Sequence, residues 1–243
     1  MRICFTSIDV ETNPTALEEV LELFKELGIE ATLFVSGEIL ERYPERFKKW
    51  QRDFEIASHS FSHRFWPELS EIERKKELDR FVNLYKKIFN KTPFGFRAPS
   101  HLIDEKGMKL LEKFEFLYDS SILPHYPFFK RYRGFKGKAP LLPYFPSFEN
   151  CRKSGEMRIL EIPTTGQIFG IPLTGIWIRK LPLFVYELLF LLHSPSFLTL
   201  LLHSFDVPNQ GFLKKLKKLL KLLKKKNYQF LKGIQIYEKF SKD

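Results

Sequence analysis

The sequence predicts an α/β fold, in which short buried strands alternate with longer amphipathic helices. Three observations lead to this prediction. Short apolar runs recur along the chain, and segments with apolar residues every three or four positions separate them. Helix-capping residues stand where the helical segments begin. No repeat or linker divides the 243 residues, so we expect a single domain over residues 1–243.

The first half of the chain has clear element boundaries. The expected strands are short, apolar or β-branched runs: Arg2–Ile8, Ala31–Val35, Glu55–Ser58, Phe94–Phe96 and Phe116–Tyr118. Asn13 and Pro14 carry the signals for the start of a helix that ends at Gly28. Ser70 and Glu73 predict a capping box for the next helix, and Glu105–Phe114 has the pattern of another.

The second half is less regular. Leu123–Gly155 is rich in Pro, Phe, Gly and basic residues, and we expect a long irregular insertion whose role stays open. The strands expected after it are Ile159–Pro163, Phe197–Leu202 and Tyr228–Leu231. The helices expected there are a buried one at Leu181–Leu192 and a Lys/Leu helix at Gly211–Lys225.

Charge and cysteine content bound the functional classes. The formal net charge of +11 favours anionic partners, but much of the excess lies in Lys214–Lys226. No basic-aromatic motif accompanies these lysines, so we expect no nucleic-acid partner. Cys4 and Cys151 form no metal-binding or disulfide pattern. The first residues lead into a strand without a signal-peptide pattern, so we expect a cytoplasmic protein, with contact at the inner membrane face as an alternative.

The residues suited to chemistry follow the expected strands. They share a position at or just beyond a strand's carboxyl end, and they are Asp9, Glu11, His59, His63, Arg97 and His203. Catalytic and binding sites of α/β proteins form at this end of the strands. We therefore expect these side chains to meet in one site.

A metal site is the first prediction from these residues. His59 and His63 are four residues apart, so on one helical turn their imidazoles face the same side and can bind one metal ion. A carboxylate from another strand completes a set that leaves a position open for water. Asp9 and Glu11 divide readily into one ligand and one general base, although Glu11 also suits a helix N-terminus electrostatically.

These segments together resemble a known family. In chain order they are Ser-Ile-Asp9-Val-Glu11, Ala-Thr-Leu-Phe-Val-Ser-Gly37, His59-Ser-Phe-Ser-His63, Phe-Arg97-Ala-Pro99, Tyr118-Asp119-Ser-Ser121 and Leu-Leu-His203. The combination resembles the polysaccharide deacetylase (NodB-homology) family, the family-four carbohydrate esterases. The likeness runs from about residue 3 to residue 206, and residues 207–243 are expected to add a closing helix and strand.

The resemblance implies a distorted (β/α) barrel of about seven strands, a divalent metal, and hydrolysis of N-acetylated sugars. The metal is expected to be zinc, with cobalt or another ion as alternatives. By position, His59 and His63 are the metal ligands and Asp9 is the general base. Arg97 would hold Asp9, and His203 would be the general acid.

The sequence departs from the family pattern in two places. The usual second aspartate is replaced by Val10, and we favour Glu11 as the carboxylate ligand. The alternative is that Asp9 binds the metal and another group is the base. Ser100 and His101 replace a glycine region, which leaves the shape of the substrate groove open.

The expected function is therefore metal-dependent removal of an N-acyl group, most specifically N-acetyl, from an amino sugar. The saccharide could be a polysaccharide or be linked to a lipid or a nucleotide. A deformylase of a lipid-linked amino sugar and a metal-free amidohydrolase are alternatives on the same fold. A non-catalytic module that binds membrane or nucleic acid is a further alternative. For Lys214–Lys226 we favour a final barrel helix with solvated lysines over a helix that contacts anionic membrane. The oligomeric state stays open.

Overall fold

The computed structural model describes residues 1–125, 133–166, 172–206 and 210–241. Its strands form one nine-stranded parallel sheet in the order β6-β5-β4-β3-β2-β1-β8-β7, with β9 also paired to β1. The strands are β1 (Arg2–Val10), β2 (Thr32–Val35), β3 (Glu55–Ser58), β4 (Gly95–Phe96), β5 (Tyr118–Asp119), β6 (Leu160–Glu161), β7 (Leu173–Thr174), β8 (Phe197–His203) and β9 (Tyr228–Leu231).

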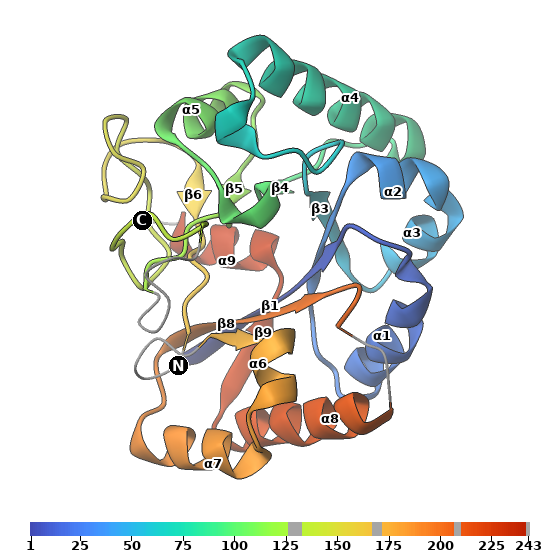
Figure 1. Cartoon of the computed structure of the whole chain (residues 1–243), viewed down its shortest axis with the longest axis vertical. Coiled ribbons are helices and arrows are strands. Elements are labelled where there is room, and N and C mark those ends of the chain that lie inside the picture. Colours follow the sequence, from blue (N-terminus) through green and yellow to red (C-terminus); the bar gives the residue numbers. More distant parts are fainter. Residues whose placement is uncertain (126–132, 167–171, 207–209, 242–243) are drawn as a thin grey trace.

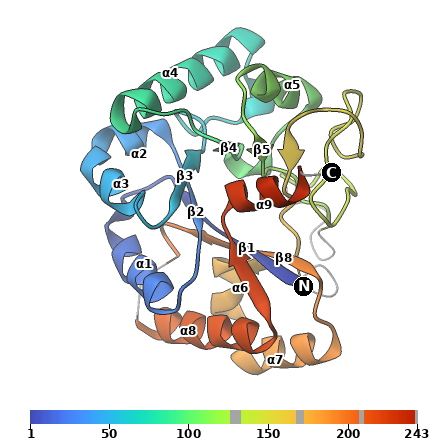
Figure 2. The same cartoon turned by 180° about the vertical axis from the view of Figure 1, so that it is seen from behind.

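Helices surround this sheet (Figures 1 and 2). They are α1 (Leu17–Glu26), α2 (Gly37–Arg42), α3 (Pro44–Trp50), α4 (Glu71–Phe89), α5 (Glu105–Lys113), α6 (Gly175–Lys180), α7 (Leu183–Leu192), α8 (Gln210–Lys225) and α9 (Gly233–Phe240). Short 3₁₀ segments lie at Pro14–Ala16, Trp66–Glu68 and Pro99–His101.

The predicted α/β class is confirmed, and the sheet curls as a partial barrel. After β6 the chain turns toward β8, where the Thr199 N–H donates to the Thr165 carbonyl at 2.9 Å. The described strands number nine, against the about seven that the resemblance implies. The two-residue strand β7 was not predicted, and β9 joins the sheet beside β1. The α9 helix, which the sequence pattern did not predict, follows β9.

β1 is the centre of the sheet. It pairs with β8 over residues 3–9, with β9 over residues 2–5 and with β2 over residues 7–10. Its residues from Ile3 to Val10 are all buried, as expected of a parallel strand covered on both faces. The end of β1 is therefore held from both sides.

Most predicted elements of the first half are confirmed. The Ser70–Glu73 capping box begins α4, and Asn90 ends that helix in the left-handed conformation. Asn13 caps a short 3₁₀ turn that leads into α1. The short helices α2, α3 and α6 were not predicted, since six or seven residues show too little periodicity.

The expected insertion at 123–155 is irregular where the structure describes it, and residues 126–132 lie outside the described ranges. It is anchored by isolated bridges between Tyr144 and Glu161 and between Pro146 and Ser154. The first bridge joins the insertion to β6, and the second closes the insertion on itself.

The prediction of a buried helix at 181–192 is wrong in one respect. The helix forms as α7, but Phe184, Leu188, Leu191 and Leu192 are exposed. α7 lies at the periphery of the molecule and only one of its faces meets the core (Figure 1), so an apolar composition all round did not indicate burial. Among the described helices, none is both long and apolar enough to cross a membrane.

Candidate metal and acid–base site

The predicted site residues lie at one edge of the sheet because the strands that carry them are parallel neighbours. Asp9 at the end of β1 pairs in register with Phe34 of β2 and with His203 of β8. Ser58 at the end of β3 pairs with Phe96 of β4, so His59 and Arg97 follow neighbouring strand ends. The sequence rule on strand ends therefore placed these residues correctly.

Glu11, His59 and His63 form a cluster with metal-ligand chemistry. One ligand atom from each, two imidazole nitrogens and a carboxylate oxygen, lies within 4.8 Å of the others. His59 Nδ1 lies 2.8 Å from the Arg97 carbonyl and donates to it, so Nε2 is the nitrogen that faces Glu11, with Oε2 3.8 Å away. His63 Nε2 contacts the same carboxylate oxygen. This donor set fits a divalent metal such as zinc.

The surroundings of Glu11 keep it ionised. Burial alone would raise its pKa, but the polar interactions and charges of His59 and His63 outweigh that effect. The pKa of Glu11 is therefore held well below its usual value. An ionised carboxylate beside two imidazoles is the state that binds a metal cation.

The loop that carries the two histidines is not the helical turn that the sequence predicted. Residues 59–63 are non-helical, and Ser60 and His63 have positive φ angles of 62° and 55°. The imidazole centroids nevertheless lie 4.9 Å apart. A tight loop brings the imidazoles together, and the spacing of four residues gave the right proximity for the wrong reason.

Glu77 of α4 holds this loop. Its carboxylate accepts hydrogen bonds from Ser60 Oγ at 3.0 Å, the Phe61 N–H at 3.1 Å, the Ser62 N–H at 2.8 Å and Ser62 Oγ at 2.7 Å. Glu77 is 6% exposed. Because a buried carboxylate needs such donors, we infer that it fixes the loop between the two histidines.

Asp9 and Arg97 form a buried ion pair beside the cluster. Arg97 Nη1 donates to Asp9 Oδ1 at 2.7 Å and to Ser7 Oγ at 2.9 Å. Its Nε and Nη2 donate to the carbonyl and hydroxyl of Ser120, both at 2.8 Å. Burial would raise the pKa of Asp9, but the Arg97 charge, followed by His59 and His203, lowers it below its ordinary value.

His203 lies on the other side of the site and is oriented by Asp206, three residues later. Asp206 Oδ2 accepts from the His203 backbone N–H at 2.8 Å and lies 3.2 Å from Nδ1, which donates to it. Arg179 Nη2 donates to the other carboxylate oxygen at 2.8 Å. Burial would lower the pKa of His203, but the Asp206 hydrogen bond and the charge of Asp9 raise it.

Gly175 at the start of α6 makes this arrangement possible. A Cβ there would lie 2.1 Å from Asp206 Oδ2. A larger residue would push the Asp206 carboxylate away from His203. The glycine is thus required by the close approach of a side chain to the backbone.

His101 also lies near this group, although the sequence gave it little weight. Its Nδ1 donates to the Ser121 carbonyl at 3.2 Å, and within the described ranges its buried Nε2 has no hydrogen-bond partner. Burial, followed by the Arg97 charge, lowers the pKa of His101 to about 3. A neutral imidazole with a vacant acceptor can bind a donor group of a ligand.

Sequence reasoning missed three of the supporting residues. Asp206 follows His203 by three residues, a spacing that could have indicated a carboxylate partner. Glu77 lies beside Leu78 on the buried face of α4, where a charged residue signals a specific partner. Arg179 carried no signal, because its contact depends on a short helix that was not predicted.

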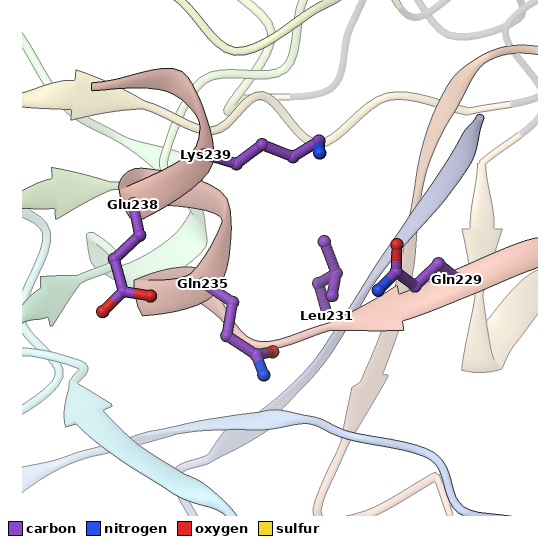
Figure 3. Close-up of a pocket in the computed structure, with 5 residues that line it drawn as sticks. All are labelled: Gln229, Leu231, Gln235, Glu238 and Lys239. Carbon is purple, nitrogen blue, oxygen red and sulfur yellow. The ribbon is translucent and has the colours of Figure 1, made fainter. Parts of the chain in front are cut away.

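A hollow of about 440 Å³ between β9 and α9 is distinct from this site. Figure 3 shows the residues that line it: Gln229, Leu231, Gln235, Glu238 and Lys239. Leu231 pairs with Phe5, four residues before Asp9 on β1, and so lies roughly 13 Å back along that strand. Its lining lacks the histidines and carboxylates gathered at the strand ends.

Comparison with known proteins finds a family that resembles the part of the chain carrying most of this site. Residues 3–118, which carry Asp9, Glu11, His59, His63 and Arg97, match the family described as polysaccharide deacetylase. This part of the chain is therefore similar to that family. The resemblance inferred from the motifs is thereby confirmed.

Curated relatives match less than half of the chain. A peptidoglycan deacetylase-like protein of Gibberella zeae is 33% identical over 109 residues, which are 44% of this chain and 32% of the relative. A peptidoglycan deacetylase of Helicobacter pylori is 29% identical over 108 residues, 44% of this chain and 37% of the relative. The chain thus spans about a third of the length of these relatives.

Solved structures extend the fold likeness over nearly the whole chain. A Mycobacterium smegmatis protein, described as a polysaccharide deacetylase, has a TM-score of 0.71 at 18% identity, over 98% of this chain and 90% of that chain. Puue allantoinase has a TM-score of 0.70 at 16% identity, and the match covers 98% of this chain and 89% of that chain. At these identities the likeness concerns the fold, and one fold carries several activities.

Proposed function

We propose that this chain is a metal-dependent deacetylase that hydrolyses the N-acetyl group of an amino sugar in a saccharide. The observation that carries the proposal is the gathering of three groups at one sheet edge. Glu11, His59 and His63 are the donor cluster, and Asp9–Arg97 and His203–Asp206 lie beside it. The family match over residues 3–118 supports the same reaction.

Glu11, rather than Asp9, is the proposed carboxylate ligand. Its oxygen lies with the two imidazole nitrogens, whereas Asp9 Oδ1 is engaged by Arg97. A divalent ion, for which zinc is our first choice and cobalt the second, would polarise the amide carbonyl and lower the pKa of a water molecule. This assignment leaves Asp9 for proton transfer.

Asp9 is the proposed general base. Its lowered pKa keeps it ionised at neutral pH, and Arg97 fixes the position of its carboxylate. It can therefore accept a proton from the water that attacks the amide carbon. Since Arg97 is fully buried and has three other hydrogen bonds, it holds Asp9 in one place during the reaction.

His203 is the proposed general acid. Its Nδ1 is engaged by Asp206, so Nε2 is the nitrogen that can face the substrate. The departing amine is too basic to leave without a proton, and a His203 with a raised pKa holds that proton near neutral pH. The products are acetate and the free amino sugar.

The proposal is tested by measuring acid release from N-acetylated saccharides, with chitin oligosaccharides and peptidoglycan fragments as probes. We expect acetate release by the zinc- or cobalt-loaded protein, and its loss in His203→Gln. Formate release from an N-formyl sugar, without acetate, would favour the deformylase alternative. Activity that survives complete metal removal would contradict the metal-dependent mechanism.

A further inference from the structure

The α7 helix presents an exposed apolar stripe. Phe184, Leu188 and Leu191 lie at spacings of four and three residues, so they share one face, and they are 65%, 52% and 73% exposed. The following Leu192 is 66% exposed. Glu187 is the single charged residue of the helix. Contiguous exposed apolar faces of this kind mark interaction surfaces.

The lysine-rich helix α8 lies beside this stripe. Tyr186 and Phe190 of α7 belong to the same buried core as Leu216 and Leu220 of α8, so the two helices pack side by side and bury one face each. In both views they lie together at the bottom of the molecule (Figures 1 and 2). Their uncovered faces therefore point away from the same core.

The uncovered face of α8 is strongly cationic. It carries Lys214, Lys218, Lys221 and Lys225, which are exposed and form no ion pair among the described residues. The helix has no acidic residue. Lys217, on the flank, pairs with Glu26 of α1 at 2.7 Å. An apolar stripe and an unpaired cationic face thus lie next to each other.

We propose that this α7–α8 surface binds an anionic lipid bilayer. The lysines contact anionic headgroups, and Phe184, Leu188 and Leu191 enter the boundary between headgroups and acyl chains. α7 has ten residues and is about 15 Å long, half the thickness of a bilayer core, so it lies on the membrane and does not span it. This surface supports the membrane contact that the sequence left as the less favoured alternative to a solvated barrel helix.

Other occupants fit this surface less well. In a two-fold dimer each copy contributes the same patch, which would bring lysine-rich α8 helices toward each other. Nucleic acid would use the lysines but leave the apolar stripe in water. An anionic bilayer offers headgroups for the α8 lysines and an apolar layer for the α7 stripe. The proposal is independent of the function proposed above.

Contacts connect the α7–α8 surface to the His203–Asp206 pair of the candidate site. α8 begins four residues after Asp206, and Lys215 Nζ donates to the Arg179 carbonyl at 3.2 Å. Arg179 in turn holds Asp206. A protein bound through α7 and α8 would therefore have the His203–Asp206 pair close to the membrane-facing side.

The test is co-sedimentation of the full chain with vesicles of phosphatidylcholine alone or with added phosphatidylglycerol. We expect binding to the anionic vesicles that weakens with salt. Lys214→Gln/Lys218→Gln/Lys221→Gln/Lys225→Gln, and separately Phe184→Ser/Leu188→Ser/Leu191→Ser, should each lower the affinity about tenfold or more. All seven side chains are exposed, and circular dichroism checks that both variants fold.

A matched control removes the same charge elsewhere. Lys75, Lys76, Lys86 and Lys87 are exposed on α4, at the opposite end of the molecule (Figure 1). Changing these four to Gln should leave vesicle binding within about twofold of wild type, if position matters and not net charge alone. Equal losses of vesicle affinity in the α8 and α4 lysine variants would overturn the proposal. So would tight binding to duplex DNA without vesicle binding, or a dimer abolished by the serine variant.

Discussion

Two carboxylate–arginine pairs flank the candidate site, and they have similar geometry in different surroundings. Arg97 meets Asp9 at 2.7 Å and Arg179 meets Asp206 at 2.8 Å. The Arg97 side chain is fully buried, whereas that of Arg179 is 34% exposed. The distance between partners therefore does not decide what each pair contributes.

The contacts of each carboxylate define its role. Asp9 is bound by an arginine that has serine partners as well, so the pair is rigid and Asp9 stays ionised. Asp206 accepts hydrogen bonds from Arg179 and from the backbone N–H and Nδ1 of His203, so its charge acts on the imidazole. The first pair positions a proposed base, and the second adjusts a proposed acid.

Loss of the Asp9 charge should have the largest effect on activity. In Asp9→Asn the side chain keeps its size but cannot accept the proton, so we expect kcat to fall about 10²- to 10⁴-fold. Arg97 keeps Ser7 and Ser120 as partners, and the fold should persist. Steady-state kinetics with circular dichroism checks this, and activity within about tenfold of wild type would remove Asp9 from the base role.

Replacing each arginine should lower the free energy of unfolding by a different amount. Arg97→Met leaves the Asp9 carboxylate buried without its cation and should lower the free energy of unfolding by about 3–5 kcal/mol. Arg179→Met should cost about 1 kcal/mol or less, because that arginine is partly exposed and His203 still binds Asp206. Urea denaturation measures both, and Asp9→Asn/Arg97→Met should recover part of the larger loss. Equal losses for the two methionine variants would contradict the comparison.

Loss of the Asp206 charge should move the alkaline limb of the pH profile. Asp206 raises the pKa of His203, so the acid form persists to higher pH and activity falls as the pH rises through that pKa. Asp206→Asn should therefore lose activity at a pH lower by about one unit or more. The shift is measured from kcat across about pH 5–10, sampled at intervals of about one pH unit or less. An alkaline limb at the wild-type position would mean that another group is the acid.

Loss of the Arg179 charge should have the smallest effect on catalysis. Arg179→Gln keeps a donor near Asp206, and a partly exposed ion pair contributes about 0–1 kcal/mol, so kcat should fall about twofold to fivefold. Kinetics beside Arg179→Lys, which keeps the charge, checks the estimate. A loss as large as that of Asp9→Asn would mean that Arg179 touches the reacting groups.

The contrast between the pairs also explains what the sequence could predict. Asp9 and Arg97 end buried strands, and the rule that sites form at strand ends found both. Arg179 lies on a six-residue helix without a periodic signal, and its contact with Asp206 spans 27 residues. Local patterns report position on a strand or helix, whereas contacts between distant segments depend on tertiary packing.

The errors in the prediction have the same physical origin. The His59–His63 spacing suggested a helical turn, but Glu77 of α4 stabilises a loop with positive φ angles instead. The apolar composition of α7 suggested burial, yet its place at the periphery leaves one face uncovered. Strands such as β3 and β9 were predicted correctly because their residue pattern is local.

Metal binding by purified protein tests the central proposal most directly. We expect about one zinc or cobalt ion per wild-type chain by elemental analysis or titration, and loss of that ion in His59→Ala/His63→Ala. Glu11→Gln should weaken binding more than Asp9→Asn, since the Glu11 oxygen lies with the imidazole nitrogens. A folded wild-type protein that binds neither zinc nor cobalt would contradict the account.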